Sequence, residues 1–302
     1  MRSSSYGRVV CLVSTFLPLW LAAAVDLAFP FVLSAVAARE IIVACNWRNV
    51  MIPVPIGVLG LADLLMYLEL AGVVLPAGLG SRLALVAIIV LISVIGGRII
   101  PAFTRNWLLR RGACSLPGKY WWPDRMALGT LHVGVVGWAF FPTARAVGMI
   151  LIVSAAFNLW RLSRWRGLST APEPLLAILH VGYGWLVIGT ALLGASLLSD
   201  RVPQAATVHA LTVGAIGTMI LAVMTRVTRG HTGRQLVANR LTSLMYVLIN
   251  LAAISRIMVA WFSAAFTNLL GLSAVLWVAS FGLFILSYWP LLSGPRADAP
   301  ID

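Results

Sequence analysis

The chain has 302 residues, of which 61% are hydrophobic and 10% are charged, and its net charge is +13. Soluble domains carry roughly a quarter charged side chains, so this composition excludes a soluble fold. The positive charge does not indicate nucleic-acid binding, because almost all of it is arginine placed between apolar runs, as in membrane proteins.

Ten apolar runs are long enough to cross a bilayer as helices, since about 20 apolar residues span its hydrocarbon core. We therefore predict an all-α, polytopic transmembrane bundle of about ten spans, forming a single domain over residues 1–302. A short cytoplasmic tail is expected at 291–302. The predicted spans are 9–24, 27–45, 50–72, 81–101, 126–141, 144–162, 174–198, 204–226, 240–262 and 267–290.

The first two predicted spans are separated only by Asp26 and Pro30. We divide them because one helix over 9–45 would exceed the bilayer by ~15 residues. Arg2 and Arg8 precede the first run, as in a secretory signal, but no small-residue cleavage site follows it. The run is therefore interpreted as a retained span.

Basic residues near the ends of the predicted spans fall almost entirely on one side of the membrane. Only Arg82, Arg145 and Arg201 fall on the other side. Because cytoplasmic loops hold the excess of Lys and Arg, both termini are predicted to be cytoplasmic, which requires an even number of spans. The cysteines form no closely spaced pair and indicate neither a disulfide framework nor a thiolate metal cage; they are Cys11, Cys45 and Cys114.

Histidines at membrane depth are the first functional candidates, because ionisable groups are costly there. His132 and His180 each lie six residues into a span that enters from the cytoplasm, so both are expected ~9 Å deep. Two imidazoles at one depth could hold a b-type haem between their helices. Alternatively, each histidine forms only an interhelical hydrogen bond.

Other polar residues extend this set. His209 is predicted near the outer end of the next span, too far from His180 to share a metal ion easily. His231 follows in a cytoplasmic turn of glycines and arginines, which suits an anionic group but is equally explained as a plain loop. Arg256 is predicted within a span, where a buried anion or a carbonyl partner is expected. The glycines and Pro101 at 96–101 are expected to end a helix.

Several blocks together resemble the NnrS family over nearly the whole chain, from about residue 6. These blocks are Asn46 to Asn49, Gly97 to Asn106, Asn158 to Gly167, Leu179-His180 with Gly182-Tyr183, His209 to Gly217, Thr225-Arg226 and Gly230 to Arg234. The resemblance implies a multi-pass protein of the bacterial cytoplasmic (inner) membrane that contains haem and copper and is associated with nitric oxide metabolism and resistance to nitrosative stress.

By this resemblance, His180, His209 and His231 are the expected cofactor and metal positions. The expected supporting charges are Arg98, Arg105, Arg226 and Arg256, and His132 is kept on its depth alone. Family members usually begin with two further spans and a His-rich stretch ending in His-Glu-Met, and this chain starts after that point. Copper is therefore the less secure cofactor.

Two other classes of function are compatible with the sequence. A transporter for a small anion is suggested by Arg256 and by paired spans, and in a structural subunit the histidines would only bridge helices. The expected partners are the lipid bilayer and nitric oxide or a related small molecule, with a partner subunit undetermined. Neither the residues nor the resemblance decides whether the protein is an enzyme.

Overall fold

The computed structural model describes residues 18–297, and every regular element in that range is a helix. Eight of these helices are long and apolar enough to cross a membrane. Helix α6 (Trp122–Phe140) has 19 residues but is not one of these eight. The prediction of an all-α, polytopic membrane protein is confirmed. The predicted span 9–24 lies largely outside the described residues.

The chain divides into two compact units. Unit 1 contains residues 1–94 and 135–142, and unit 2 contains residues 95–134 and 143–302. The expectation that they form a single transmembrane domain stays a prediction, because a packing unit is not necessarily an independent folding domain.

Unit 1 is built on α2 (Leu19–Val43), α3 (Pro53–Leu70) and α4 (Leu79–Leu91), with α3 packed against both of the others. Glycines allow close contact: a Cβ at Gly80 would lie 2.7 Å from Met66 Cγ. Arg82 Nε donates to the Ala139 carbonyl at 2.9 Å, which ties α4 to the end of α6.

The expected break near Asp26 is wrong, because α2 runs without interruption from Leu19 to Val43. Asp26 is accommodated within the helix, since Tyr67 Oη on α3 lies 3.2 Å from its Oδ2 and donates to it. Pro30 is tolerated inside the helix, as proline often is in membrane helices. At 25 residues, α2 is ~37 Å long and fits a bilayer with some tilt.

Unit 2 contains the remaining helices, which are mostly joined by short connections. They are α5 (Gly97–Arg110), the first part of α6, α7 (Arg145–Ser163), α8 (Pro174–Leu198), α9 (Gln204–His209), α10 (Thr218–His231), α11 (Arg240–Met258) and α12 (Phe266–Ser293). A π-helical segment, Ala210–Gly217, joins α9 to α10 without a break.

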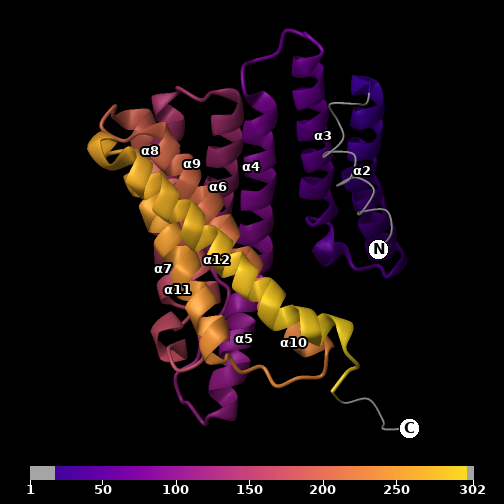
Figure 1. The fold of residues 1–302 in the computed structure, drawn as a ribbon, viewed down its shortest axis with the longest axis vertical. Helices are drawn as coiled ribbons and strands as arrows, with labels where there is room; N and C mark the ends of the chain where they lie inside the picture. The colour runs from indigo at the N-terminus through magenta and orange to yellow at the C-terminus, as the bar shows by residue number, and fades with distance from the viewer. Residues whose placement is uncertain (1–17, 298–302) are drawn as a thin grey trace. The chain divides into compact units, whose positions relative to one another are not determined.

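Helix α8 lies at the centre of unit 2. It packs against α5, α7, α9, α10 and the π-helical segment, whereas α12 packs mainly along α11 (Figure 1). Small residues make the close contacts possible: a Cβ at Gly189 would lie 2.5 Å from Leu211 Cδ2. Close approach at glycine is the usual way in which membrane helices gain packing energy. Much of α8 is therefore closely packed inside unit 2.

The helix break expected at Pro101 is also wrong. Helix α4 continues through a π-helical segment, Ile92–Gly96, directly into α5, and the continuous helix covers Leu79–Arg110. Pro101 does remove one backbone donor, as expected, but the helix continues, because a membrane helix tolerates this loss when another group replaces the donor. The carbonyl that loses its donor belongs to the candidate site described below.

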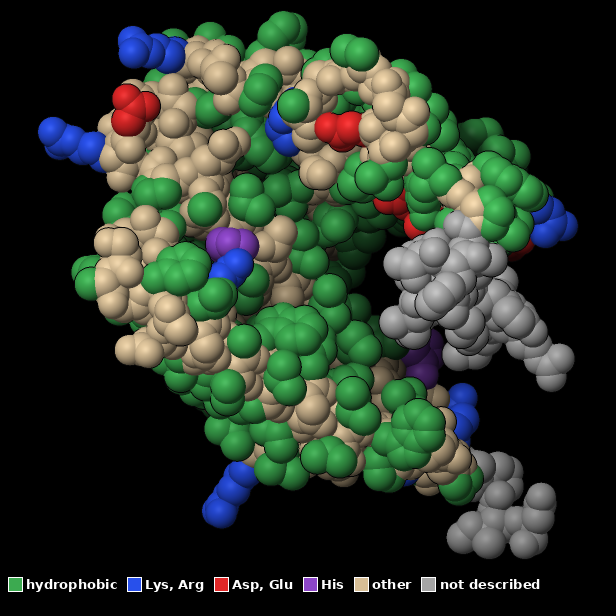
Figure 2. All heavy atoms as spheres, turned by 45° about the horizontal axis from the view of Figure 1, so that its top comes forward, with side chains coloured by type: hydrophobic (Ala, Val, Ile, Leu, Met, Phe, Trp, Pro, Cys, Tyr) green, Lys and Arg blue, Asp and Glu red, His purple; other side chains and the backbone are tan. Residues whose placement is uncertain are grey.

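The surface of the protein is apolar. Hydrophobic side chains cover most of the face drawn in Figure 2, while charged side chains are few and scattered. Leu286 on α12 is 74% exposed. Such surfaces would promote aggregation in water but match acyl chains. The protein is therefore a multi-pass membrane protein.

Candidate functional site

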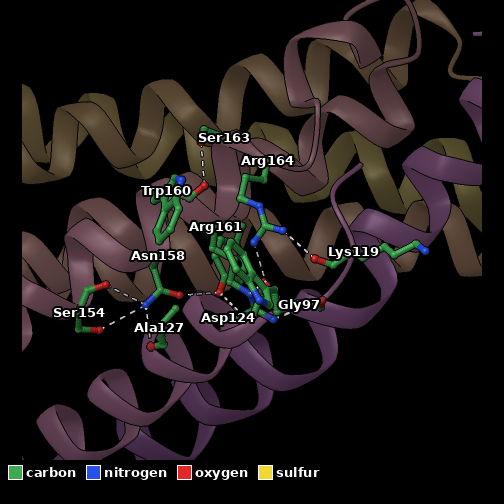
Figure 3. A network of polar contacts seen from close by, with 12 residues as sticks. Gly97, Lys119, Asp124, Ala127, Ser154, Asn158, Trp160, Arg161, Ser163 and Arg164 are labelled. Atoms are coloured by element: carbon green, nitrogen blue, oxygen red, sulfur yellow. Dashed lines mark hydrogen bonds and ion pairs between the residues drawn. The ribbon is translucent and has the colours of Figure 1, made fainter. Parts of the chain in front are cut away.

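A buried ionic network lies where α5, α6, α7 and α8 meet in unit 2 (Figure 3). We call it the Arg161 cluster; its members are Asp124, Asn158, Arg161, Arg164 and Tyr183. Arg161 Nε donates to Asp124 Oδ1 at 3.1 Å, and Arg164 Nη1 donates to Asp124 Oδ2 at 3.0 Å. Arg161 is only 2% exposed, so one carboxylate holds two guanidinium groups in a largely dry environment.

Tyr183 and Asn158 extend the Arg161 cluster into the core. Arg161 Nη1 donates to Tyr183 Oη at 2.9 Å, and Tyr183 Oη donates to Asn158 Oδ1 at 2.8 Å. Asn158 Nδ2 donates to the Ala127 and Ser154 carbonyls. Each polar group of the Arg161 cluster thus has a partner, which is the condition for burying such a network without a large penalty.

Gly97 and Pro101 explain how α5 accommodates Arg161. Proline has no N–H to donate to the carbonyl four residues earlier, which is that of Gly97. Arg161 Nη2 lies 3.4 Å from this oxygen and takes the place of the missing donor. A Cβ on Gly97 would lie 2.3 Å from Nη2, so only glycine leaves room for the guanidinium.

Trp165 connects the Arg161 cluster to His180. The Trp165 ring lies edge-on to Tyr183 at 4.7 Å and to His180 at 6.4 Å between centroids. The Arg161 guanidinium carbon lies 5.1 Å from the centre of the Trp165 ring, within the range of a cation–π interaction. Trp165 therefore contacts both the His180 ring and Arg161, one of the two arginines that neutralise Asp124.

The hydrogen bonds of Thr104 favour a proton on His180 Nε2. Thr104 Oγ1 donates to the Ile100 carbonyl at 2.8 Å. With its proton used there, the hydroxyl, 2.9 Å from His180 Nε2, can accept from an N–H at that nitrogen. His180 Nδ1 is then a bare lone pair, and this buried nitrogen has no hydrogen-bond partner among the described residues.

Gly167 faces this lone pair. Arg166 before it has a left-handed backbone (φ 60°), which turns the chain after α7 back toward α8. A Cβ on Gly167 would lie 2.8 Å from His180 Nδ1, so any other residue would fill the space that glycine leaves there. The arrangement leaves a neutral, oriented nitrogen that is buried against Gly167 and could bind an electron-pair acceptor or a proton donor if one entered this space.

The other predicted histidines lie elsewhere. His132 on α6 is partly buried, and the charge of Arg161 acts on it, so it flanks the Arg161 cluster from the side of α6. His209 and His231 lie near opposite ends of the continuous helix Gln204–His231, ~33 Å apart. They cannot bind one metal ion. Within residues 18–297, no three His, Cys, Asp or Glu side chains come together to hold a metal.

The predicted arginines are also dispersed. Arg98 is partly buried on α5, and Arg105 is exposed on the same helix. Arg226 on α10 lies over the Phe103 ring at 4.2 Å. Arg256 lies in the last turn of α11, which ends at Met258, four residues earlier than predicted. None of these arginines belongs to the Arg161 cluster.

Sequence reasoning missed the centre of this site. It counted Arg161 and Arg164 as topology charges and gave Asp124 no role, although all three have buried or half-buried side chains. One signal was present: Asn158 and Arg161 are spaced at i and i+3, which places them on one face of α7. A polar stripe of this kind on a membrane helix indicates a buried network.

Comparison with known proteins gives one match. The NnrS family, described as "NnrS protein", matches residues 4–296. No curated protein and no solved structure is similar enough to count as a match. Since the match covers nearly the whole chain and includes both units and the Arg161 cluster, this multi-pass membrane protein belongs to the NnrS family.

Proposed function

We propose that the protein binds haem through His180 and acts in nitric oxide metabolism and resistance to nitrosative stress, in the bacterial cytoplasmic membrane. Membership of the NnrS family supports the physiological part of this proposal. The observation that carries the chemical part is the buried, partnerless Nδ1 of His180.

The residues around His180 fit the requirements of an iron ligand. Iron takes a neutral imidazole nitrogen, and ligating histidines usually donate the other ring N–H to a partner that fixes the tautomer. Thr104 is that partner here, and Gly167 keeps side-chain atoms away from Nδ1. When bound, haem would supply an iron that binds nitric oxide or exchanges electrons with it.

The number of available ligands favours haem over copper. One or two axial side chains suffice for haem, because the porphyrin supplies four nitrogens. A copper site takes several protein ligands, and the described part of the chain gathers no group of three. Copper is therefore the weaker part of the proposal. His132 on α6, which lies near enough to Arg161 for its charge to act on it, is the other histidine that could hold haem.

An optical spectrum of the purified full chain tests the proposal. We expect a Soret band that shifts when nitric oxide is added. His180→Ala should lose most of this band, whereas His231→Ala, which changes an exposed histidine at the end of α10, should retain it. Folding of each variant is checked by gel filtration in detergent. Iron-free, colourless wild-type protein would contradict the proposal.

Two further variants test the geometry of His180. Gly167→Ala places a methyl group against Nδ1 and should reduce haem content strongly. Thr104→Val removes the acceptor of the Nε2 proton and should weaken haem retention or change the spectrum, because the tautomer is no longer fixed. Full haem content in Gly167→Ala would show that the iron does not bind Nδ1.

A further inference from the structure

An exposed group of tryptophans lies at the end of unit 2 where α6 begins and α7 ends. Trp121, Trp122 and Trp160 form an edge-to-face array, with successive ring centroids 5.8 Å and 6.0 Å apart. These side chains are 57%, 49% and 41% exposed, so residues 18–297 leave them largely uncovered. Tryptophans of this kind are enriched where the headgroups of a bilayer meet the acyl chains. The three residues, here called the tryptophan array, therefore mark the headgroup level.

The loop before α6 is anchored to α7. The Gly118 N–H donates to the Arg164 carbonyl at 3.1 Å, and Arg164 Nη2 donates to the Lys119 carbonyl at 2.7 Å. The Trp121 N–H donates to Asp124 Oδ2 at 2.9 Å. Three hydrogen bonds thus hold four consecutive residues, while the Lys119 side chain extends away from Arg164 (Figure 3). An anchored backbone therefore presents the ammonium group next to the tryptophan array.

Two cations beside the tryptophan array have no protein partner. Lys119 and Arg125 are exposed, and neither side chain forms a hydrogen bond or an ion pair with any residue between 18 and 297. Arg125 follows Trp122 by three positions, which places both on one face of α6. The carboxylates described at this end of unit 2 are Asp124, which two arginines neutralise, and Glu173, which is buried. The described surface here therefore has exposed cations and no exposed carboxylate.

We propose that the tryptophan array, Lys119 and Arg125 form a binding site for an anionic phospholipid such as phosphatidylglycerol. The two cations bind the lipid phosphate by charge-assisted hydrogen bonds, and the indole rings pack against the glycerol backbone and the first methylene groups. Charge complementarity selects this partner, because the ammonium group of a zwitterionic lipid is repelled by the same cations. A free phosphate ion makes no use of the apolar rings. The site does not depend on haem binding at His180.

Native mass spectrometry of the full chain in detergent tests the site by counting bound dioctanoyl-phosphatidylglycerol. We expect saturable binding that is about fivefold weaker in Lys119→Gln and in Arg125→Gln, since each basic residue near a membrane surface contributes about this factor. Both side chains lack protein partners, so both variants should fold, which gel filtration checks. Trp122→Leu keeps the charges and should also weaken binding. Arg240→Gln is the matched control and should bind like the wild type, because Arg240 is also exposed but begins α11, which packs mainly against α12.

Other ligands separate the outcomes. Dioctanoyl-phosphatidylcholine has the same phosphate and acyl chains without net charge, and it should bind about fivefold more weakly or worse. Equal binding of the two lipids would indicate an ordinary aromatic belt and would overturn the proposal. Displacement of the lipid by inorganic phosphate at similar concentration would also overturn it, and so would an equal loss of affinity in Arg240→Gln and Lys119→Gln, which would indicate diffuse surface charge. Haem content should be unchanged in Lys119→Gln, so failure of this proposal and failure of the haem proposal are distinguishable.

Discussion

Gly97→Ala tests the Arg161 cluster with a single added methyl group. Its Cβ would lie 2.3 Å from Arg161 Nη2, whereas ordinary contact begins at 3.4 Å, so the guanidinium must move by at least about 1 Å. That movement weakens the bonds to Asp124 and Tyr183. Each charge-assisted bond contributes about 1.5–3 kcal/mol to stability, and the higher helix propensity of alanine offsets about 1 kcal/mol of the loss. We expect the free energy of unfolding to fall by about 2–4 kcal/mol.

The matched control for Gly97→Ala is Gly129→Ala on α6, where an added Cβ meets no atom within 4 Å. This control should be neutral or stabilising by up to about 1 kcal/mol. Both variants are compared by equilibrium unfolding in mixed detergent micelles, followed by circular dichroism. In an Arg161→Met background the cost of Gly97→Ala should largely vanish. The reasoning is refuted if Gly97→Ala and Gly129→Ala have the same free energy of unfolding.

The same unfolding assay checks two further predictions. Asp124→Asn should cost about 3–5 kcal/mol, because it leaves two arginines without their counter-charge. Arg39→Ala, which breaks an exposed ion pair, should lower the free energy of unfolding by less than about 1 kcal/mol. Equal losses in Asp124→Asn and Arg39→Ala would show that burial does not strengthen the Asp124 ion pairs. Gly214→Ala places a Cβ 2.8 Å from the Trp185 ring and should cost about 1–3 kcal/mol. Gly217→Ala, whose Cβ would have its nearest contact at 3.5 Å, should lower the free energy of unfolding clearly less. Equal losses in the two variants would show that the Trp185 ring moves away from an added Cβ.

The spans were predictable because lipid imposes one simple rule on the chain. A long apolar run without backbone partners in the bilayer must become a helix, and every predicted span from residue 50 onward corresponds to a helix. The errors occurred at Asp26 and at Pro101, where a local signal normally ends a helix. Tyr67 donates a hydrogen bond to Asp26, and Arg161 donates to the Gly97 carbonyl in place of the N–H that Pro101 lacks. Both remedies come from another helix, so local sequence could not reveal them.

The histidines could be identified as candidates from their depth, but their chemistry could not. The importance of His180 depends on Thr104, 76 residues earlier, which contacts its Nε2, and on Gly167, which places no side chain against Nδ1. The interpretation of Arg161 as a topology charge failed for a similar reason. A basic residue near the end of a span can face water or the protein interior, and the choice depends on whether an acid such as Asp124 lies within reach.

The sequence by itself determined that this chain is a helical, multi-pass membrane protein of the NnrS family, because hydropathy and family motifs are written along the chain and need no knowledge of packing. Only the tertiary structure decided which polar groups have partners. It paired Arg161 with Asp124, and it left His180 Nδ1 without a hydrogen-bond partner among the described residues. The physical reason is that in a low-dielectric bundle the state of a polar group depends on atoms within about 4 Å, and these belong to other helices.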